Sequence, residues 1–357
     1  MKIPIRYDEY IKGIDINNDS VDVTFLKKKK VALLFISINP NYWPYLEQVI
    51  KDCRQNFLPH HNVDYFVWSD MPEGTIPNVH LTSVEPIEWP APTLMRYHLF
   101  LQEEERLKDY DYIFYLDADM RVVEKISDEI LGKDLTVALH PMYDLKPQLL
   151  PPYEPNQDST AFVPRLGHLV DAQAWADGEI RGGTAQSILD SGRKPRLRPL
   201  YLAGGFQGGN ATSFLEAMRV MKKNIDIDFN KNYVAIWNDE SHWNKYLFEH
   251  KGPILSPDII VLGADYVYPD SLIKEYYEPI WGKSYKPKII TLTKPFTTSK
   301  QSGKELQKML NQPTTESGNQ FQCPTCKDVL EYPNHRIKRV VTCQGSKKPH
   351  ELEMTKL

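Results

Sequence analysis

The stretch VALLFISI, which runs from Val31 to Ile38, is apolar at almost every position and has the length of a β-strand. A continuous apolar run of this kind favours a strand that is buried on both faces, as in a parallel sheet. A breaker follows at 39–41, and beyond it apolar residues recur at helical spacing over 43–57, which predicts an amphipathic helix. The fold is therefore predicted to begin with a buried strand and a helix.

The same alternation continues along the chain. We expect further strands at 64–68, 112–116 and 135–139, and helices over about 93–107, 210–224 and 239–250. Strands that alternate with helices indicate an α/β fold with a mostly parallel sheet, and such sheets bind ligands beyond the carboxyl ends of their strands. Between 146 and 199 the pattern fails, apart from a predicted short helix near 168–176, so we interpret this stretch as a long loop over the site.

Composition narrows the class of protein. The chain has 357 residues, 41% hydrophobic and 25% charged, with a net charge of −4. No apolar run reaches the roughly 20 residues needed to span a bilayer, and residues 1–20 contain no signal-peptide core, so we expect a cytoplasmic globular protein. Residues 281–357 carry 14 Lys and Arg against 6 Asp and Glu. This basic end favours a solvated tail, a surface for nucleic acid or anionic membrane, or a segment that closes over a phosphate-bearing substrate.

Asp117-Ala118-Asp119 directly follows the predicted strand at 112–116. Two carboxylates one residue apart in a turn can converge on one divalent cation, and hard oxygen ligands suit Mg²⁺ or Mn²⁺. The oxygens of a diphosphate would complete the coordination of such a metal. The structural alternative is a pair of solvated aspartates in a loop.

A glycine-rich stretch, GGFQGG, runs from Gly204 to Gly209 and leads into a helix at Asn210. Paired glycines allow the backbone to approach a ligand closely. The alternative is an ordinary glycine turn capped by Asn210. A dinucleotide-binding loop is excluded, because the order of the glycines differs and no convincing strand precedes them.

The stretch WNDESHWNKYL covers residues 237–247. Asn238 is predicted to cap the helix, and Asp239 and Glu240 fall in its first turn, where the helix dipole favours negative charge. A capped helix would explain these residues. The density of Trp, His, Asn and Glu also suits a polar pocket with an aromatic wall, against which sugar rings pack.

The end of the chain carries a potential zinc set. Its members are Cys323, Cys326, Cys343 and His350, with His335 as an alternative fourth ligand. The alternative is a basic, weakly ordered tail with unpaired thiols.

Several of these stretches together resemble glycosyltransferase family 6, which holds the ABO histo-blood-group transferases, the α1,3-galactosyltransferase and the Forssman synthase. The similarity covers roughly 31–265 and keeps the order of the family's motifs. They are FYLDADM at 114–120, His140-Pro141, Tyr153-Glu154, AFVP at 161–164, the glycines at 204–209, and the stretch 235–251 with LSP at 255–257. The resemblance implies a single nucleotide-sugar-binding α/β domain of the GT-A type, a Rossmann-like mixed sheet flanked by helices.

The resemblance also implies a role for each matching residue. Asp117 and Asp119, with Ala118 between them, would hold Mn²⁺ (or Mg²⁺) and the UDP diphosphate. Contacts to the rest of the donor fall on Phe35, Ile38 and Tyr42 for the uracil, and on Arg96 and Asp239 for the sugar. Ala203 and Gly205, on either side of Gly204, occupy the positions that distinguish one donor sugar from another in this family. The acceptor and reaction centre would be lined by His140, Trp237 and Glu240, with Glu240 as the catalytic carboxylate.

These roles predict a retaining transferase that moves GalNAc or Gal from a UDP-sugar to the 3-hydroxyl of a β-galactoside-type oligosaccharide or glycolipid. Because Gly205 has no side chain, we expect room for an acetamido group and favour GalNAc. A soluble microbial or viral member is expected. The alternatives are a non-catalytic carbohydrate-binding protein with a decayed site, and a nucleic-acid binder that uses its tail.

The predicted organisation has three parts. A GT-A domain occupies 1–296 and has an inserted loop region near 166–198. A polar linker follows at 297–317, and a small cysteine-containing unit occupies 318–357.

Overall fold

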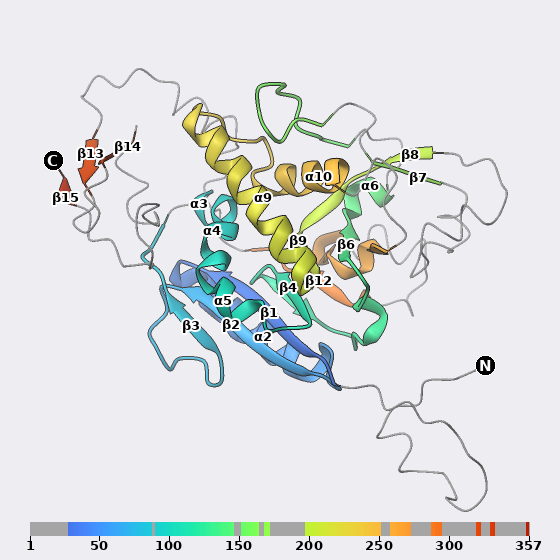
Figure 1. The fold of residues 1–357 in the computed structure, drawn as a ribbon. Helices are drawn as coiled ribbons and strands as arrows, with labels where there is room; N and C mark the ends of the chain where they lie inside the picture. The colour runs from blue at the N-terminus through green and yellow to red at the C-terminus, as the bar shows by residue number, and fades with distance from the viewer. Residues whose placement is uncertain are drawn as a thin grey trace, which may run out of the picture.

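The apolar run at 31–38 forms β1 (Lys30–Ser37), near the middle of a seven-stranded sheet (Figure 1). The computed structural model describes residues 28–87, 90–145, 151–163, 168–171, 197–250, 258–272 and 287–294, with short strands at 319–322, 329–332 and 355–356. The other strands of the main sheet are β2 (Asn62–Ser69), β3 (His80–Ser83), β4 (Tyr112–Leu116), β6 (Leu135–Leu139), β9 (Leu202–Asn210) and β10 (Ile260–Leu262).

The sheet is mixed, with the strand order β10-β6-β9-β4-β1-β2-β3. Strand β9 is antiparallel to both of its neighbours, β4 and β6, whereas the other pairs are parallel. The prediction of an α/β protein with a mostly parallel sheet is therefore confirmed, and the strand that departs from it is the glycine-rich one.

Both faces of β1 are buried, as its sequence predicts. Val31, Leu33 and Phe35 point into one hydrophobic core, and Ala32 and Leu34 into the core on the other face. Successive side chains of a strand point to opposite faces, so a strand covered on both sides must be apolar throughout.

Helices cover the two faces of the sheet. On one face α2 (Trp43–Asn56) packs through the apolar positions that predicted it, among them Leu46 and Val49. The other face is covered by α4 (Arg96–Phe100), α9 (Ala211–Asn230) and α10 (Asp239–His250) (Figure 1). Asn210 caps α9, because its side-chain oxygen accepts a hydrogen bond from the Thr212 amide at 3.1 Å.

The continuous helix expected over 93–107 is wrong. Four short pieces replace it: α3 (Ala91–Leu94), α4, a 3-10 turn η2 (Leu101–Glu103) and α5 (Glu104–Leu107). The backbone leaves the α conformation at Met95 (φ −92°, ψ 8°) and again at Glu103 (φ −101°, ψ 15°). Periodicity of apolar residues does not record such local breaks.

The glycines at 204–209 are also not a turn, because they lie inside strand β9. A Cβ at Gly208 would lie 2.5 Å from the carbonyl oxygen of Ile113, and Gly209 has φ 139°. A larger residue would therefore force β9 away from its neighbours or into a strained conformation. The glycines that locally signal a turn are required by close packing at the centre of the sheet.

A smaller sheet extends the end of β4. Strand β5 (Met120–Val122) pairs antiparallel with β12 (Ile289–Thr291), which pairs in turn with β11 (Tyr268–Pro269). The remaining short helices of the described chain are η1 (Pro40–Tyr42), η3 (Asp128–Ile130), α6 (Pro141–Leu145), η4 (Ala264–Tyr266) and η5 (Asp270–Leu272).

Two further strand groups belong to the described chain. Where a short helix near 168–176 was expected, β7 (His168–Asp171) instead pairs antiparallel with β8 (Leu197–Leu200), so that prediction is wrong for 168–171, while 172–176 lie outside the described residues. Strands β13 (Asn319–Gln322), β14 (Val329–Tyr332) and β15 (Thr355–Lys356) form a three-stranded antiparallel sheet. The predicted zinc ligands Cys323, Cys326, Cys343, His350 and His335 lie outside the described residues.

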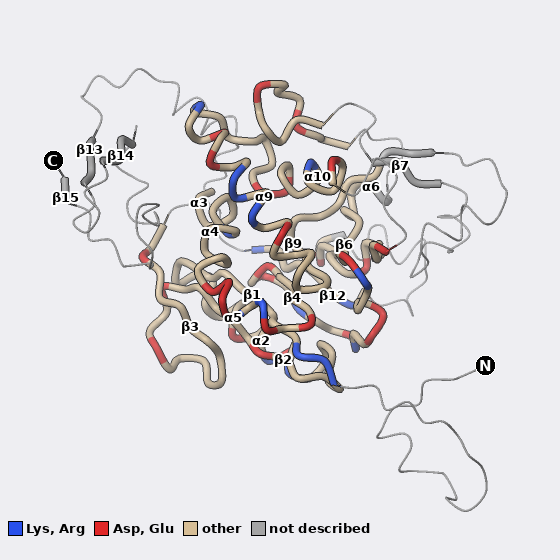
Figure 2. The backbone as a smooth tube through the Cα atoms, viewed as in Figure 1, with Lys and Arg blue, Asp and Glu red and all other residues tan. Residues whose placement is uncertain are grey.

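Basic and acidic side chains are interspersed along the described chain, with a basic run at Lys28–Lys30 before and at the start of β1 (Figure 2). Within the described ranges, no helix combines the length and the apolar character needed to cross a bilayer.

Candidate active site

A cleft of about 1320 Å³ opens beyond the carboxyl ends of β1 and β4. Its walls come from segments far apart in the sequence. They include Ile36 in β1, Ile38 to Trp43 after it, residues 83–87, Thr93 and Arg96, Asp117 to Asp119, Gly204 and Gly205, Trp237 to Glu240, and Lys294. Most of the predicted site residues meet here, at the edge of the sheet where ligands of α/β proteins bind.

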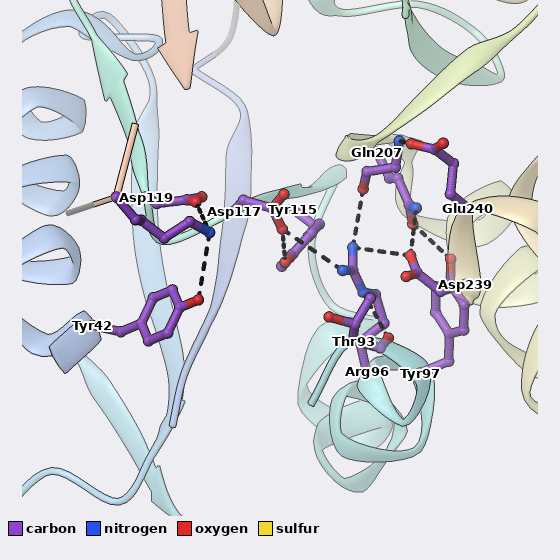
Figure 3. A network of polar contacts seen from close by, with 12 residues as sticks. Tyr42, Thr93, Arg96, Tyr97, Tyr115, Asp117, Asp119, Gln207, Asp239 and Glu240 are labelled. Atoms are coloured by element: carbon purple, nitrogen blue, oxygen red, sulfur yellow. Dashed lines mark hydrogen bonds and ion pairs between the residues drawn. The ribbon is translucent and has the colours of Figure 1, made fainter. Parts of the chain in front are cut away.

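Asp117 is the first residue after β4, and three neighbours fix it. Its amide donates a hydrogen bond to the Gly205 carbonyl oxygen at 3.0 Å. Its carboxylate accepts a hydrogen bond from the Tyr115 hydroxyl and lies 3.7 Å from Arg96 Nη2 (Figure 3). The neighbouring strand β9 and the buried arginine thus hold Asp117 in place.

Asp119 is 5% exposed, and its carboxylate lies 2.5 Å from Lys294 Nζ. Burial raises the pKa of Asp119, the Asp117 carboxylate raises it further, and Lys294 opposes both. Lys294 also lies 3.4 Å from the Tyr42 hydroxyl. The backbone supports this arrangement, because Leu292 N donates to the Asp119 carbonyl oxygen at 2.9 Å.

Sequence reasoning missed Lys294. The pairing of β12 with β5 brings it beside Asp119, and the two residues are far apart in the sequence. The only sequence signal for such a residue was the general excess of basic residues after 281, one interpretation of which was closure over a phosphate.

Arg96 and Asp239 form a buried ion pair. Arg96 is 3% exposed and Asp239 is 1% exposed, and Arg96 Nη1 lies 3.1 Å from Asp239 Oδ2 (Figure 3). Arg96 also donates to the carbonyl oxygens of Gly204 at 3.0 Å and Thr93 at 3.1 Å. Burial raises the pKa of Asp239 to about 7, with Arg96 opposing this and the nearby carboxylates of Asp117 and Glu240 adding to it.

Gln207, which sequence reasoning also missed, contacts the Asp239 carboxylate of this ion pair. It is buried in β9, accepts a hydrogen bond from the Tyr97 hydroxyl at 2.9 Å and donates to Asp239 Oδ2 at 3.4 Å (Figure 3). A polar residue inside a glycine-rich strand was the available signal.

Glu240 lies in the first turn of α10 and reaches back to β9. Its Oε2 accepts a hydrogen bond from the Gly204 amide at 2.7 Å. A Cβ at Gly204 would lie 3.0 Å from Glu240 Cβ, so the glycine permits this close approach. Asn244 reinforces the contact: its Nδ2 donates to the carbonyl oxygens of Leu202 and Glu240, each at 2.9 Å, and its Oδ1 accepts from Leu202 N at 3.0 Å.

Of the residues predicted to contact an acceptor sugar, Trp237 lines the cleft and His140 does not. Trp237 lines the cleft and is 47% exposed, which is unusual for a large hydrophobic side chain among the described residues. His140 is not among the cleft-lining residues; its ring packs against Tyr143 and Tyr201, with centroids 5.1 and 5.7 Å away. Tyr201 in turn lies near Glu240: burial raises the pKa of Tyr201, and the Glu240 carboxylate raises it further.

Three predictions about single residues need correction. Phe35 is fully buried in the core and does not line the cleft, unlike Ile38 and Tyr42. Ala203 is likewise a core residue. The space expected beside Gly205 is occupied, since a Cβ there would lie 2.7 Å from Asp117 Oδ2 and 2.6 Å from Met120 Cε.

The expected N-cap is a further correction. The side-chain oxygen of Asn238 has no hydrogen-bond partner, so it does not cap α10. The main-chain amide of Trp237 instead donates to Ser241 Oγ at 3.2 Å.

The two aspartates fit a metal that a ligand helps to coordinate. Among the residues that the structure describes, no group of three or more His, Cys, Asp and Glu side chains could cage a metal alone. Asp117 and Asp119 offer hard carboxylate oxygens at the cleft surface, and Mg²⁺ is commonly bound by one or two carboxylates together with substrate phosphates.

The cleft thus brings the carboxylates of Asp117, Asp119, Asp239 and Glu240 together with the cations of Arg96 and Lys294. Comparison with known sequences identifies the family: the model of glycosyltransferase family 6 matches residues 16–195 and 198–272. The chain belongs to glycosyltransferase family 6 and is, by that membership, a hexosyltransferase.

Similar proteins come from bacteria and animals. The chain is 25% identical over 230 residues to the O-antigen biosynthesis glycosyltransferase WbnI of Escherichia coli, covering 63% of this chain and 86% of the relative. It is 26% identical over 231 residues to human globoside alpha-1,3-N-acetylgalactosaminyltransferase 1, covering 61% and 57%. It is 26% identical over 260 residues to rat histo-blood group ABO system transferase 1, covering 70% and 64%. The match therefore spans less than two thirds of the two mammalian relatives.

Proposed function

We propose that the protein is a retaining transferase that moves GalNAc or Gal from a UDP-sugar to the 3-hydroxyl of a β-galactoside-type oligosaccharide or glycolipid. The observation that carries this proposal is the convergence of Arg96, Asp117, Asp239 and Glu240, from three separate segments, on one cleft. The name of the human relative, an alpha-1,3-N-acetylgalactosaminyltransferase, supports the linkage and the sugar.

Donor binding falls to the ends of β1 and β4. Ile38 and Tyr42 line the cleft where the uracil would pack, and Asp117 and Asp119 would hold Mn²⁺ or Mg²⁺. A bound divalent cation supplies charge neutralisation for the diphosphate as it leaves. Lys294, whose Nζ lies 2.5 Å from the Asp119 carboxylate, would offer a second positive charge to the same phosphates.

The donor sugar would lie between Arg96 and Glu240. Arg96 and Asp239 present a fixed donor and acceptor of hydrogen bonds, and the buried pair keeps both in position without reorganisation. Glu240 faces the reaction as either a transient nucleophile or a charge that stabilises an oxocarbenium-like transition state while the departing UDP takes the acceptor's proton. Trp237 offers an aromatic face to the acceptor sugar, with His140 behind Tyr201.

The organisation of the chain is part of this proposal: a transferase domain at 1–296 with an insertion near 166–198, a linker at 297–317 and a unit at 318–357 that binds zinc through Cys323, Cys326, Cys343 and His350. Elemental analysis of chelator-free protein tests the zinc, which should remain after dialysis at about one ion per chain.

A donor screen tests the activity. Purified protein with Mn²⁺ is offered UDP-GalNAc, UDP-Gal and other UDP-sugars, with and without lactose-like acceptors, and both UDP release and transfer product are measured. We expect transfer that is abolished by EDTA, restored by Mn²⁺, and negligible in the double variant Asp117→Asn with Asp119→Asn. Full activity in EDTA would refute the metal site, and sugar binding without any UDP release would favour the non-catalytic carbohydrate-binding alternative.

A further inference from the structure

Asn238 is in an unfavourable state that the proposed mechanism leaves unexplained. It is 7% exposed, and its side-chain Oδ1 has no hydrogen-bond partner. Its φ angle is 52°, in the left-handed region, which residues with a side chain adopt uncommonly and asparagine more readily than most. A buried acceptor without a donor and a strained backbone both cost stability, and such residues cluster where a ligand binds.

The surrounding chain enforces this conformation. The Asn238 amide donates to the Ala235 carbonyl oxygen at 2.9 Å, and the Trp237 amide donates to Ser241 Oγ at 3.2 Å. One residue earlier, the Ile236 amide donates to the buried carboxylate of Glu154 at 2.6 Å. Three consecutive main-chain amides, of Ile236, Trp237 and Asn238, are therefore each anchored by a hydrogen bond.

The side-chain oxygen of Asn238 is a hydrogen-bond acceptor, and this determines which ligand group would satisfy it. Asn238 lines the cleft together with Trp237, Asp239 and Glu240. An ionised carboxylate only accepts hydrogen bonds, and the indole of tryptophan only donates through its ring N–H. A ligand that satisfies Asn238 must bring a hydrogen-bond donor to this wall of the cleft, and an O–H group of a sugar is such a donor.

We propose that Asn238 is a sugar-binding residue of the cleft, whose Oδ1 accepts a hydrogen bond from a hydroxyl of either the transferred or the receiving sugar. This inference rests on the proposed function and adds a specificity contact to it. The backbone strain is then the cost of presenting the amide to the ligand instead of to the end of the helix.

Two variants separate the ligand contact from the backbone. Asn238→Gly removes the amide and also relieves the positive φ, so we expect it to fold at least as stably as the wild type. Asn238→Ala removes the same amide but keeps the strain. Both should weaken sugar recognition equally, by roughly three- to tenfold, the usual effect of losing one neutral hydrogen bond. Asn232→Gly is the matched control, because Asn232 has φ 60° on the preceding loop and does not line the cleft.

The measurements distinguish the two sugars. Calorimetry with Mn²⁺ compares the affinities for the UDP-sugar and for UDP alone; a loss confined to the UDP-sugar assigns the contact to the donor. A raised KM for the galactoside acceptor, with donor affinity unchanged, assigns it to the acceptor. Either result supports the proposal, provided that Asn232→Gly changes neither value.

Other outcomes overturn it. If the wild type transfers sugar and both Asn238 variants recognise the two sugars as well as it does, the amide contacts only water and this inference is wrong while the proposed function stands. If activity falls only as far as folded protein is lost, Asn238 belongs to the fold. A wild type that binds no UDP-sugar refutes the proposed function itself, before any variant is compared.

Discussion

The guanidinium of Arg96 lies 3.1 Å from the Asp239 carboxylate and also contacts Asp117 at 3.7 Å, so one buried cation joins the end of β4 to the start of α10. Arg96→Met would leave the Asp239 carboxylate buried without its partner. Breaking a buried pair in this way typically costs roughly 3–5 kcal/mol of unfolding free energy. Adding Asp239→Asn should recover part of that loss but none of the transfer activity.

Urea unfolding of the two single variants and the double variant forms a double-mutant cycle. Effects that simply add would show that the two side chains are not coupled, contrary to the observed ion pair.

Glu240→Gln is expected to separate catalysis from stability. The amide keeps an oxygen that can accept from Gly204 N but removes the charge. A preorganised charge at a reaction centre is typically worth about a hundredfold to a thousandfold in rate, whereas a carboxylate in the first turn of a helix stabilises by only about 0.3–1 kcal/mol.

We therefore expect turnover to fall by at least about a hundredfold, with UDP affinity and Tm nearly unchanged. Glu249→Gln at the other end of α10, where Glu249 pairs with Lys245, is the control and should keep full turnover. A variant that loses stability but retains its turnover would assign Glu240 to the helix.

Gly205→Ala should affect both donors alike. The added methyl would lie 2.7 Å from Asp117 Oδ2, and Asp117 is held by Tyr115 and Arg96, so its carboxylate would be displaced from the metal site. We expect rates with UDP-GalNAc and UDP-Gal to fall together, by about tenfold or more, with a higher requirement for Mn²⁺. A change of donor preference at an undiminished total rate would restore the view that Gly205 leaves space for the acetamido group.

His242 predicts a loss of stability in acid. Burial lowers its pKa from 6.5 to about 4, although Asp228, 3.8 Å away, opposes the shift. Between these two pH values the unfolded chain binds a proton that the folded protein excludes, so the stabilisation is complete above 6.5 and is lost as the pH falls through this window.

Tm measured from pH 7 to pH 4.5 should fall less steeply in His242→Gln than in the wild type. An equal slope in the two proteins would show that the folded state accommodates the charged imidazole.

Local patterns were sufficient for the elements that are buried on both faces. Strands β4 and β6 occupy the predicted residues 112–116 and 135–139, because an apolar strand bounded by polar residues has few alternatives. Strand β9 was misread, since its glycines carry a local turn signal while their spacing is decided by neighbouring strands. Lys294 could not be predicted for a similar reason. The three-residue strand β12, which precedes it, has no sequence pattern of its own, and only the pairing of β12 with β5 places Lys294 beside Asp119.

The candidate site residues were proposed from motifs that lie at the ends of elements. Asp117, Asp119 and Glu240 were found in this way, and the structure places all three in one cleft. Contacts that depend on two distant segments, such as Gln207 with Asp239, or the closed space beside Gly205, follow from packing and have no signature in a single stretch of sequence.

The pairing of β5 with β12 has a consequence for synthesis of the protein. Asp119 lies about a third of the way along the chain, yet its carboxylate meets Lys294 and its carbonyl meets Leu292. During translation the main sheet has all its strands once residue 262 has emerged from the ribosome, but the wall of the cleft beside Asp119 is incomplete until residue 294 follows. A nascent chain therefore completes its sheet before it completes its cleft.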